Sequence, residues 1–535
     1  MHTLGPPPRI APPLFCLVAA LLLACSSDED EWQPTSSSTS STGTGGSSSS
    51  SGTGGVIAPT GCLTKFDLLG AGEGSELHGV ICGAAGQVDD CDLCAAQDFY
   101  GDYECDQALI DAGLCDGPDP DCALQPADWT VAENGDDSND GSDAQPFATL
   151  QQAIDSAQPG DVIIIRGGTY MPADRTLFNM SGTAAEPIII RSAPGEQVII
   201  DGANIPEGNT EGGSTPTWTF HDAQHWRIYG PLLLTNGRGA AVLMEEATRD
   251  VDLVFIEASY NGRTASRAGH GFLIVEEEWA SVQDIHFKNC DAHHNANHLT
   301  RPGEDVAENL YQHGDGFRIK SGENVTLTGC RAWNNLDDNY DLVWAVNPVA
   351  LCQCWSGFAG RDDSQGTMTG TPGFEAEWGE GIKLGYSSDS GRHSAERCLS
   401  WKNVHLGFRM DGGPYLVDGC ASFENGRRPL GWDLAPNSTV IQNSLDLGTP
   451  NESGIPPEVT STHNSWDADS SFTVTAEDFV SVDDGPLLGP RSSDGSLPVV
   501  DFMRLVADSD LVDAGLAAAA PYGGSAPDIG CFEQY

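Results

Sequence analysis

The chain has 535 residues, with 78 acidic and 25 basic side chains and a formal net charge of −53. An acidic excess of this size opposes any polyanionic partner held by bulk electrostatics, so nucleic acid is excluded. A site for an acidic polysaccharide must therefore depend on local cations or on a bound metal ion.

The first residues predict an export signal. Leu14–Leu23 is an apolar run of about ten residues, which fits a signal-peptide core and is too short to span a bilayer. The run ends in Leu22-Leu23-Ala24-Cys25, which resembles the lipobox of bacterial lipoproteins, whose cysteine is acylated and becomes the mature N-terminus. We expect a signal peptide at 1–24 and a lipid anchor on Cys25, the alternative being an ordinary cleaved signal. The predicted location is the cell surface, as an outer-membrane lipoprotein of a bacterium.

Two segments separate this signal from the main domain. Residues 25–58 are mostly Ser, Thr, Gly and acidic residues, a composition that cannot bury a core and predicts a disordered tether. Residues 59–125 hold seven cysteines, which in an exported protein indicate a disulfide-stapled module of open connectivity. Cys91 and Cys94 would also suit zinc, but the module's cysteine-rich second half has no histidine.

The main domain, 127–535, begins with a predicted cap. Residues 146–155 carry apolar side chains at helical spacing and are followed by Pro159-Gly160, which predicts an amphipathic helix. The strand-like run Asp161–Ile165 comes next. Because the open end of a solenoid needs a cover, we expect this helix to cap one. The Gly and Asp residues of 511–533 predict a final irregular coil at the other end.

Two sequence units alternate along the domain with a period of roughly 23 residues. The first has a small apolar residue followed five positions later by asparagine, and its copies are 256–261, 290–295, 330–335, 398–403 and 420–425. The second starts at a glycine, and its copies begin at Gly271, Gly316, Gly381, Gly407 and Gly431. Two short strands and an asparagine turn per period predict the coils of an all-β parallel β-helix.

Inward cysteines recur at the start of the first unit. We expect these to be free core thiols, although the spacing of adjacent coils would also permit Cys398 to pair with Cys420.

The second unit predicts a column of charge on one face. The residue two positions after each glycine alternates with inward apolar residues and should point outward. These positions are Leu273, Arg318, Lys383, Arg409 and Asp433, with Asp341 at a matched place. The residues just before the glycine match add Asp315, Asp338 and Glu380.

Four aspartates of this face suggest a metal site. Asp315, Asp337, Asp338 and Asp341 come from two neighbouring coils, whose strands lie ~4.8 Å apart. Carboxylates this close repel one another unless a hard divalent cation neutralises them, and an all-oxygen ligand set favours calcium over zinc or copper. The alternative is a solvated acidic surface on an acidic protein.

Lys383 follows one coil later if 345–379 is a loop, as its glycines, prolines and poor alternation indicate. Calcium on a uronate carboxylate would acidify the proton on carbon 5, a neutral lysine would remove it, and the bond to oxygen 4 would break. A nearby cation and Arg409 are expected to lower the pKa of Lys383. Arg318 and Arg409 are predicted to hold substrate carboxylates, surface ion pairs being the alternative.

Several motifs resemble those of polysaccharide lyase family 9, the family 9 pectate lyases, over residues 127–535. The most specific are Gly314-Asp315-Gly316-Phe317, 335–342 and 379–385. The resemblance implies a right-handed parallel β-helix in which the aspartates matching Asp315, Asp337, Asp338 and Asp341 bind the catalytic calcium and the lysine matching Lys383 is the base. The family commonly has Gly-Trp where this chain has Asn339-Tyr340, and the loop with Cys352 and Cys354 looks longer than usual. Both departures are expected near the sugar.

The predicted function is a calcium-dependent polysaccharide lyase that acts as a monomer on pectate-like polyuronides. An alginate-type lyase or a uronan epimerase shares the same proton abstraction, and product analysis would separate them. A surface-tethered carbohydrate-binding solenoid without turnover is a further alternative, but a binder has no use for Lys383. A polygalacturonase-type hydrolase needs a protonated acid opposite a base, which a metal-filled aspartate cluster does not offer.

Overall fold

The computed structural model describes residues 127–535 apart from 207, 209–214, 263–268, 276–281, 297–313, 363–373, 376–378, 388–390, 432–437, 449–454, 468–472, 493–494, 517–523 and 534–535. All of them belong to one compact unit, Val56–Tyr535. The predicted signal peptide, Cys25, the tether and the cysteine module lie outside the described residues and stay predictions. No helix within the described ranges is long and apolar enough to cross a bilayer.

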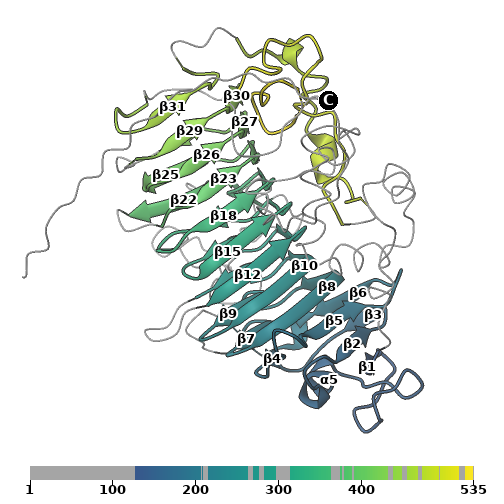
Figure 1. Ribbon diagram of the computed structural model, residues 1–535. Helices are drawn as coiled ribbons and strands as arrows, with labels where there is room; N and C mark the ends of the chain where they lie inside the picture. Colours follow the sequence, from purple (N-terminus) through teal and green to yellow (C-terminus); the bar gives the residue numbers. More distant parts are fainter. Residues whose placement is uncertain are drawn as a thin grey trace, which may run out of the picture. The chain divides into compact units, whose positions relative to one another are not determined.

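Stacked parallel strands make up almost all of the regular structure (Figure 1). One sheet has nine strands, in the order β28-β25-β22-β17-β14-β11-β9-β7-β4. Their bounds are β4 (Thr176–Phe178), β7 (Trp218–His221), β9 (Val242–Glu245), β11 (Phe272–Ile274), β14 (Phe317–Ile319), β17 (Tyr340–Asp341), β22 (Ile382–Ser387), β25 (Leu406–Gly412) and β28 (Arg428–Gly431).

The other strands of the coils form a second, twenty-stranded sheet that bends around the rest of each coil. Its first half holds β1 (Trp129–Val131), β2 (Val162–Ile165), β3 (Gly168–Tyr170), β5 (Ile188–Ser192), β6 (Val198–Asp201), β8 (Gln224–Thr235), β10 (Arg249–Ser259), β12 (Gln283–Lys288), β13 (Asp291–His293) and β15 (Glu323–Thr328). Its second half holds β16 (Arg331–Trp333), β18 (Val349–Cys352), β19 (Trp355–Gly357), β23 (Ser394–Glu396), β24 (Leu399–Trp401), β26 (Leu416–Asp418), β27 (Ala421–Phe423), β29 (Val440–Gln442), β30 (Leu445–Leu447) and β31 (Thr460–Thr462). The predicted parallel β-helix is confirmed.

A short helix, α5 (Leu150–Ser156), lies at the start of the coils, as predicted. The Thr149 side chain caps it by accepting a hydrogen bond from the Gln152 N–H, the preferred role of threonine at this position. Leu150, Ala153 and Ile154 are buried and join the main apolar core. The helix therefore covers the first coil and shields its apolar edge from water.

The turn asparagines form the predicted ladder, with one substitution that the sequence conceals. Asn295 Nδ2 donates to Asn335 Oδ1 at 3.0 Å, and Asn335 Nδ2 donates to Asn339 Oδ1 at 2.8 Å. The next coil has Ala359 at the ladder position. Asn339 fills that place from a neighbouring coil and donates to Ser356 Oγ at 3.0 Å. Beyond it, Asn403 Nδ2 continues the ladder through Asn425 Oδ1, at 2.9 Å.

Cys354, which the sequence analysis assigned to a loop, joins the four inward cysteines predicted to be free core thiols, and all of them are buried. They are Cys290, Cys330, Cys354, Cys398 and Cys420. Each Sγ points to a backbone carbonyl of a neighbouring coil, as in the 3.3 Å contact from Cys354 Sγ to Leu327 O. Burial raises the pKa of these thiols where a shift is resolved, as for Cys330. The alternative bridge between Cys398 and Cys420 does not form.

Three predictions about segments are wrong. Residues 345–379 are not simply a loop, because β18 and β19 make a regular part of a coil and only the hairpin of β20 (Arg361–Asp362) and β21 (Phe374–Glu375) departs from it in the described part. Arg409 pairs with Gly431, so Gly431 does not begin a copy of the second unit and Asp433 lies outside the described residues. The third wrong prediction is the final irregular coil at 511–533.

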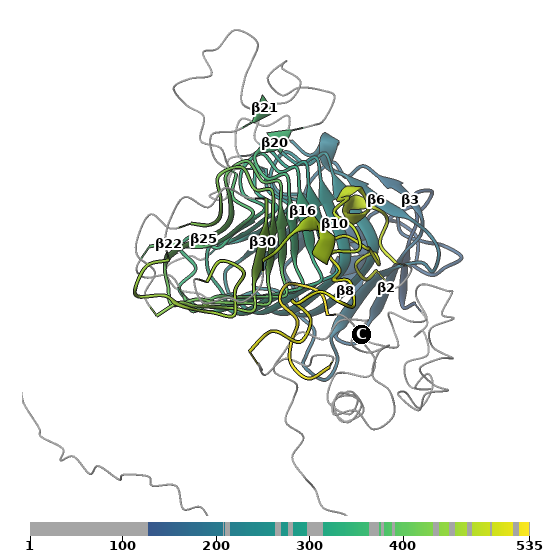
Figure 2. The same cartoon turned by 90° about the horizontal axis from the view of Figure 1, so that it is seen from above.

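The described residues of 473–532 do not form the predicted final coil. They lie along the outer face of the larger sheet, as the yellow segment in Figures 1 and 2 shows. We call this segment the C-terminal strap. Its side chains, among them Phe502, Leu511 and Ile529, bury an apolar cluster with Trp401 and Phe423 of the sheet. This face of the coils is closed, which leaves the nine-stranded sheet to carry the site.

Candidate active site

The predicted column of charge lies in register on the nine-stranded sheet. Arg318 of β14 pairs with Asp341 of β17, Asp341 with Lys383 of β22, and Lys383 with Arg409 of β25. Because side chains alternate along a strand, all four point away from the apolar core that their neighbours fill. The coil spacing deduced from the sequence is therefore confirmed for these four positions.

The carboxylates of this face form two overlapping groups. Oxygens of Asp315, Asp338 and Asp341 lie within 4.8 Å of one another, and so do oxygens of Asp337, Asp338 and Glu380. The four predicted aspartates are thus brought together around Asp338. Glu380 joins them, although the sequence analysis left it out of the ligand set.

Arg318 and Lys383 contact the aspartates of this acid cluster. Arg318 Nη1 lies 2.7 Å from Asp315 Oδ2 and 3.6 Å from Asp341 Oδ2. Lys383 Nζ lies 2.8 Å from Asp338 Oδ2 and 3.8 Å from Asp341 Oδ1. With Arg409, which pairs with Glu380, three positive groups face five carboxylates here, so the cluster keeps an excess of negative charge.

Backbone groups fix the carboxylates in place. The Asp338 N–H donates to Asp315 Oδ1 at 3.1 Å, and the Glu380 N–H donates to Asp338 Oδ1 at 2.8 Å. Glu380 Oε1 lies 2.7 Å from Arg409 Nη1, and Arg409 Nε donates to Asp411 Oδ2 at 2.7 Å. The cluster is therefore held rigidly before any ligand arrives, as a selective cation site requires.

The charged side chains of this face are more buried than the alternation along the strands predicted. Arg318 is 5% exposed and Arg409 is 4% exposed, and both guanidinium groups contact carboxylates of the chain. Leu273 is also buried, in a small apolar cluster of its own with Ala240 and Leu243. The prediction that Arg318 and Arg409 hold substrate carboxylates stays a prediction.

The pKa values of the acids reflect the excess of negative charge. Burial and the neighbouring carboxylates raise the pKa of Asp337 and of Asp338 well above the ordinary value. For Glu380, burial opposes ionisation, but hydrogen bonds to His405 and Asp338 and the nearby cations bring its pKa well below the ordinary value. Protons or a cation must therefore compensate Asp337 and Asp338.

The prediction that the pKa of Lys383 is lowered is wrong for the protein without a bound ligand. Burial lowers the pKa of this amine, but the attraction of Asp338, Asp341 and the other carboxylates is larger and raises it well above its ordinary value. Arg409 does not contribute the predicted effect because Glu380 and Asp411 neutralise it. Any lowering must come from a ligand that offsets the carboxylates.

The first departure from the family pattern, Asn339-Tyr340, does not lie where sugar was expected. Asn339 is fully buried in the ladder, and Tyr340 is fully buried in the core, stacked on Phe317 with 5.1 Å between ring centroids. Neither side chain reaches the outer face. The sequence analysis also missed His270, whose Nδ1 lies 3.1 Å from Asp315 Oδ2. Its position just before Gly271, which matches Asp315 before Gly316, was the available signal.

Comparisons with known proteins agree with this architecture. Residues 129–442 match the family described as "Pel9A-like, right handed beta helix region". The chain belongs to this family. The predicted resemblance and the right-handed parallel β-helix are thereby confirmed.

Individual relatives cover most of the domain. The chain is 28% identical to "Pectate lyase PEL9" of Emericella nidulans over 416 residues, which is 73% of this chain and 95% of the relative. It is 26% identical to "Pectate lyase L" of Dickeya dadantii over 433 residues, 76% of this chain and 90% of the relative. The crystal structure of pectate lyase Pel9A superposes with a TM-score of 0.64 at 24% identity, covering 77% of this chain and 97% of that chain. The chain is a polysaccharide lyase.

Proposed function

We propose that this lyase cleaves pectate-like polyuronides by β-elimination, with calcium in the acid cluster and Lys383 as the general base. The observation that carries the proposal is the contact of the Lys383 amine with a cluster of carboxylates that exceeds its own cations. The names of the relatives, pectate lyases PEL9 and L, support the substrate class.

The acid cluster fits a calcium ion by the chemistry of its donors. Calcium takes six to eight oxygen ligands, and carboxylates are the donors it prefers. Asp315, Asp337, Asp338 and Asp341 supply the oxygens, and the raised pKa values of Asp337 and Asp338 indicate that burial and the neighbouring carboxylates outweigh the attraction of Lys383. The ion, when bound to a uronate carboxylate, would acidify the proton on carbon 5.

The side chains have separate tasks in this proposal. The Lys383 amine, once deprotonated, takes the proton from carbon 5 of the sugar. It is held at the cluster by Asp338 and Asp341, which keep it beside the bound uronate. Arg318 fixes the orientation of Asp315, and Arg409 fixes that of Glu380. Their predicted contacts with substrate carboxylates form part of the proposal.

One screen tests the proposal. Polygalacturonate, methylated pectin, alginate and glycosaminoglycans are incubated with the protein, with calcium and with excess chelator. We expect ultraviolet-absorbing unsaturated product from polygalacturonate in calcium alone. If product forms from alginate alone, the substrate is alginate and not pectate. If uronates are epimerised without chain cleavage, the reaction is epimerisation and not β-elimination. Full turnover in excess chelator would refute the calcium assignment.

A further inference from the structure

A lysine beside the acid cluster lies outside the machinery described so far. Lys320 follows β14 and lies two residues after Arg318, so the two side chains leave the same face of the sheet. Arg318, Lys383 and Arg409 each pair with carboxylates of the chain. Within the described part of the chain, no carboxylate lies at ion-pair distance from Lys320. A half-buried ammonium group is thus left available to an anion from outside.

An exposed tryptophan accompanies this lysine. Trp344 lies three residues after Asp341 and is 56% exposed, more than any other aromatic side chain in the described ranges. Lys320 Nζ lies 5.5 Å from the centroid of the indole ring, within the range of a cation–π contact. An exposed indole offers a flat apolar face beside a polar N–H, a surface on which a sugar ring can stack.

The two residues lie one step along the strands from the acid cluster. Arg318 and Asp341 pair in register, so Lys320 is about 7 Å further along β14 at ~3.3 Å per residue. Trp344 lies in the turn that follows the partner strand β17, and its ring meets the Lys320 ammonium there. A polymer bound at the acid cluster and running along the strands would therefore place its next sugar beside both side chains.

We propose that Lys320 and Trp344 form a binding subsite for a second uronate residue of the polymer. The indole stacks on the apolar face of the sugar ring, and the ammonium pairs with the ring's carboxylate. This inference rests on the proposed function. It assigns to Lys320 and Trp344 the binding of the sugar next to the one that reacts. Free and esterified uronates then differ at this subsite, because an ester removes the charge that Lys320 pairs with.

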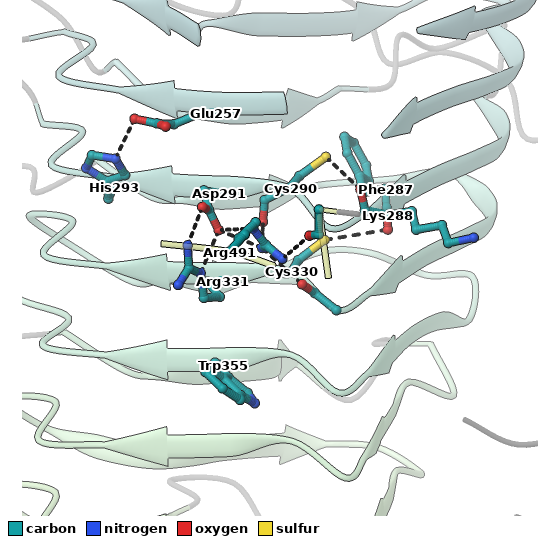
Figure 3. A network of polar contacts seen from close by, with 12 residues as sticks. Glu257, Phe287, Lys288, Cys290, Asp291, His293, Cys330, Arg331, Trp355 and Arg491 are labelled. Carbon is teal, nitrogen blue, oxygen red and sulfur yellow. Dashed lines mark hydrogen bonds and ion pairs between the residues drawn. The ribbon is translucent and has the colours of Figure 1, made fainter. Parts of the chain in front are cut away.

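The test measures binding without turnover. Calorimetric titration of the Lys383→Ala protein in calcium uses saturated tetragalacturonate and its methyl ester as the two probes. Lys320→Gln and Trp344→Ala are each added to this parent. Lys288→Gln serves as the matched control, because Lys288 is an outward lysine on β12, away from the site (Figure 3). Thermal melts confirm that every variant is folded.

We expect Lys320→Gln and Trp344→Ala each to weaken tetragalacturonate binding about tenfold, and Lys288→Gln to leave it unchanged. With the methyl ester, Trp344→Ala should still weaken binding, whereas Lys320→Gln should not. Equal binding of tetragalacturonate by the parent and both variants overturns the subsite and leaves the proposed function intact. A loss in Lys320→Gln of the same size for acid and ester overturns the carboxylate contact. A parent that binds no tetragalacturonate overturns the proposed function together with the subsite.

Discussion

Two buried charge clusters of this molecule differ in their balance of charge. On the outer face of the larger sheet, Asp291 receives two arginines, with Arg331 Nη2 at 2.7 Å and Arg491 Nη2 at 2.6 Å (Figure 3). Arg331 and Arg491 also donate to backbone carbonyls, including Gly489 O at 2.8 Å. On the nine-stranded sheet, by contrast, the three cations Arg318, Lys383 and Arg409 face five carboxylates.

The directions of the pKa shifts separate the two clusters. Burial raises the pKa of Asp291, but Arg491 and Arg331 outweigh burial and bring its pKa far below the ordinary range. At the buried Asp338 and the half-buried Asp337, neighbouring carboxylates act in the same direction as burial, and the pKa rises. At Asp291 the cations outweigh the single carboxylate and clamp the C-terminal strap, whereas at Asp337 and Asp338 the carboxylates outnumber the cations, which is the basis of the proposed calcium site.

Removing the amine of the acid cluster should have the largest effect. We expect Lys383→Ala to lower turnover by about 10² to 10⁴ while the fold is retained, since the side chain points away from the core. Lys383→Arg should be nearly as inactive at neutral pH, because guanidinium keeps its proton. Initial rates of unsaturated product measure both variants. An alanine variant that binds calcium and still turns over at the wild-type rate would place the base elsewhere.

Matched Asp→Asn substitutions test the contrast directly. Asp291→Asn leaves two buried arginines without their counter-charge and should cost about 3–5 kcal/mol in the free energy of unfolding. Asp337→Asn removes a charge from a cluster that already has too many, so without metal we expect no loss of stability. Denaturant unfolding in excess chelator measures both. A destabilisation of similar size in the two variants would refute the difference in charge balance.

The pH dependence of stability should have opposite signs at the two clusters. Because the folded pKa values of Asp337 and Asp338 are raised, the stability they contribute is fully present below about pH 4 and is lost as the pH rises. Because the folded pKa of Asp291 is lowered, its contribution is present above about pH 4 and is lost on acidification. Unfolding of the chelated protein from pH 4 to 8 should therefore show a smaller decline in Asp337→Asn than in the wild type. Identical slopes would contradict the assignment.

The asparagine ladder is uncharged and serves as a reference for the two charge clusters. Substitutions in it should have the smallest effect on stability. Asn339→Gly removes hydrogen bonds to Asn335 and Ser356 and should cost about 1–2 kcal/mol in the free energy of unfolding. Adding Ala359→Asn returns an amide at the ladder position and should recover part of that loss. The double variant compared with each single variant measures this coupling. A double variant no more stable than Asn339→Gly would show that Asn339 does not substitute for the missing asparagine.

The sequence predicted those features that recur in every coil. Arg318, Lys383 and Arg409 were aligned correctly because each follows its glycine by two residues, and strand pairing preserves that register. The alignment failed at Gly431, a glycine that does not begin a strand unit. The coil at 349–357 was missed because Ala359 replaces its ladder asparagine, and the amide that compensates comes from Asn339, twenty residues earlier in the chain.

Features without a repeat were beyond the sequence. Arg491 contacts Asp291, which lies 200 residues earlier in the chain, and no sequence pattern predicts that pair. Arg318 and Arg409 are buried by neighbouring parts of the chain. The alternation of side chains along a strand predicts only that they point outward, not whether other residues cover them. Lys320 and Trp344 belong to different coils, so their contact required the structure. Local pattern thus predicted the coils and most of the acid cluster, whereas long-range contacts decided which charges are compensated.

The central claim is that the acid cluster, whose carboxylates outnumber its cations, holds the calcium that turnover requires. Its most direct test is calorimetric titration of calcium into the metal-free protein, with polygalacturonate cleavage measured on the same samples. We predict saturable binding and calcium-dependent activity in the wild type, both lost in Asp337→Asn and Asp338→Asn. Both should be retained in Asp143→Asn, a control at a well-exposed carboxylate. Unchanged calcium binding in the Asp337 and Asp338 variants, or full activity of the wild type in chelator, would contradict the account.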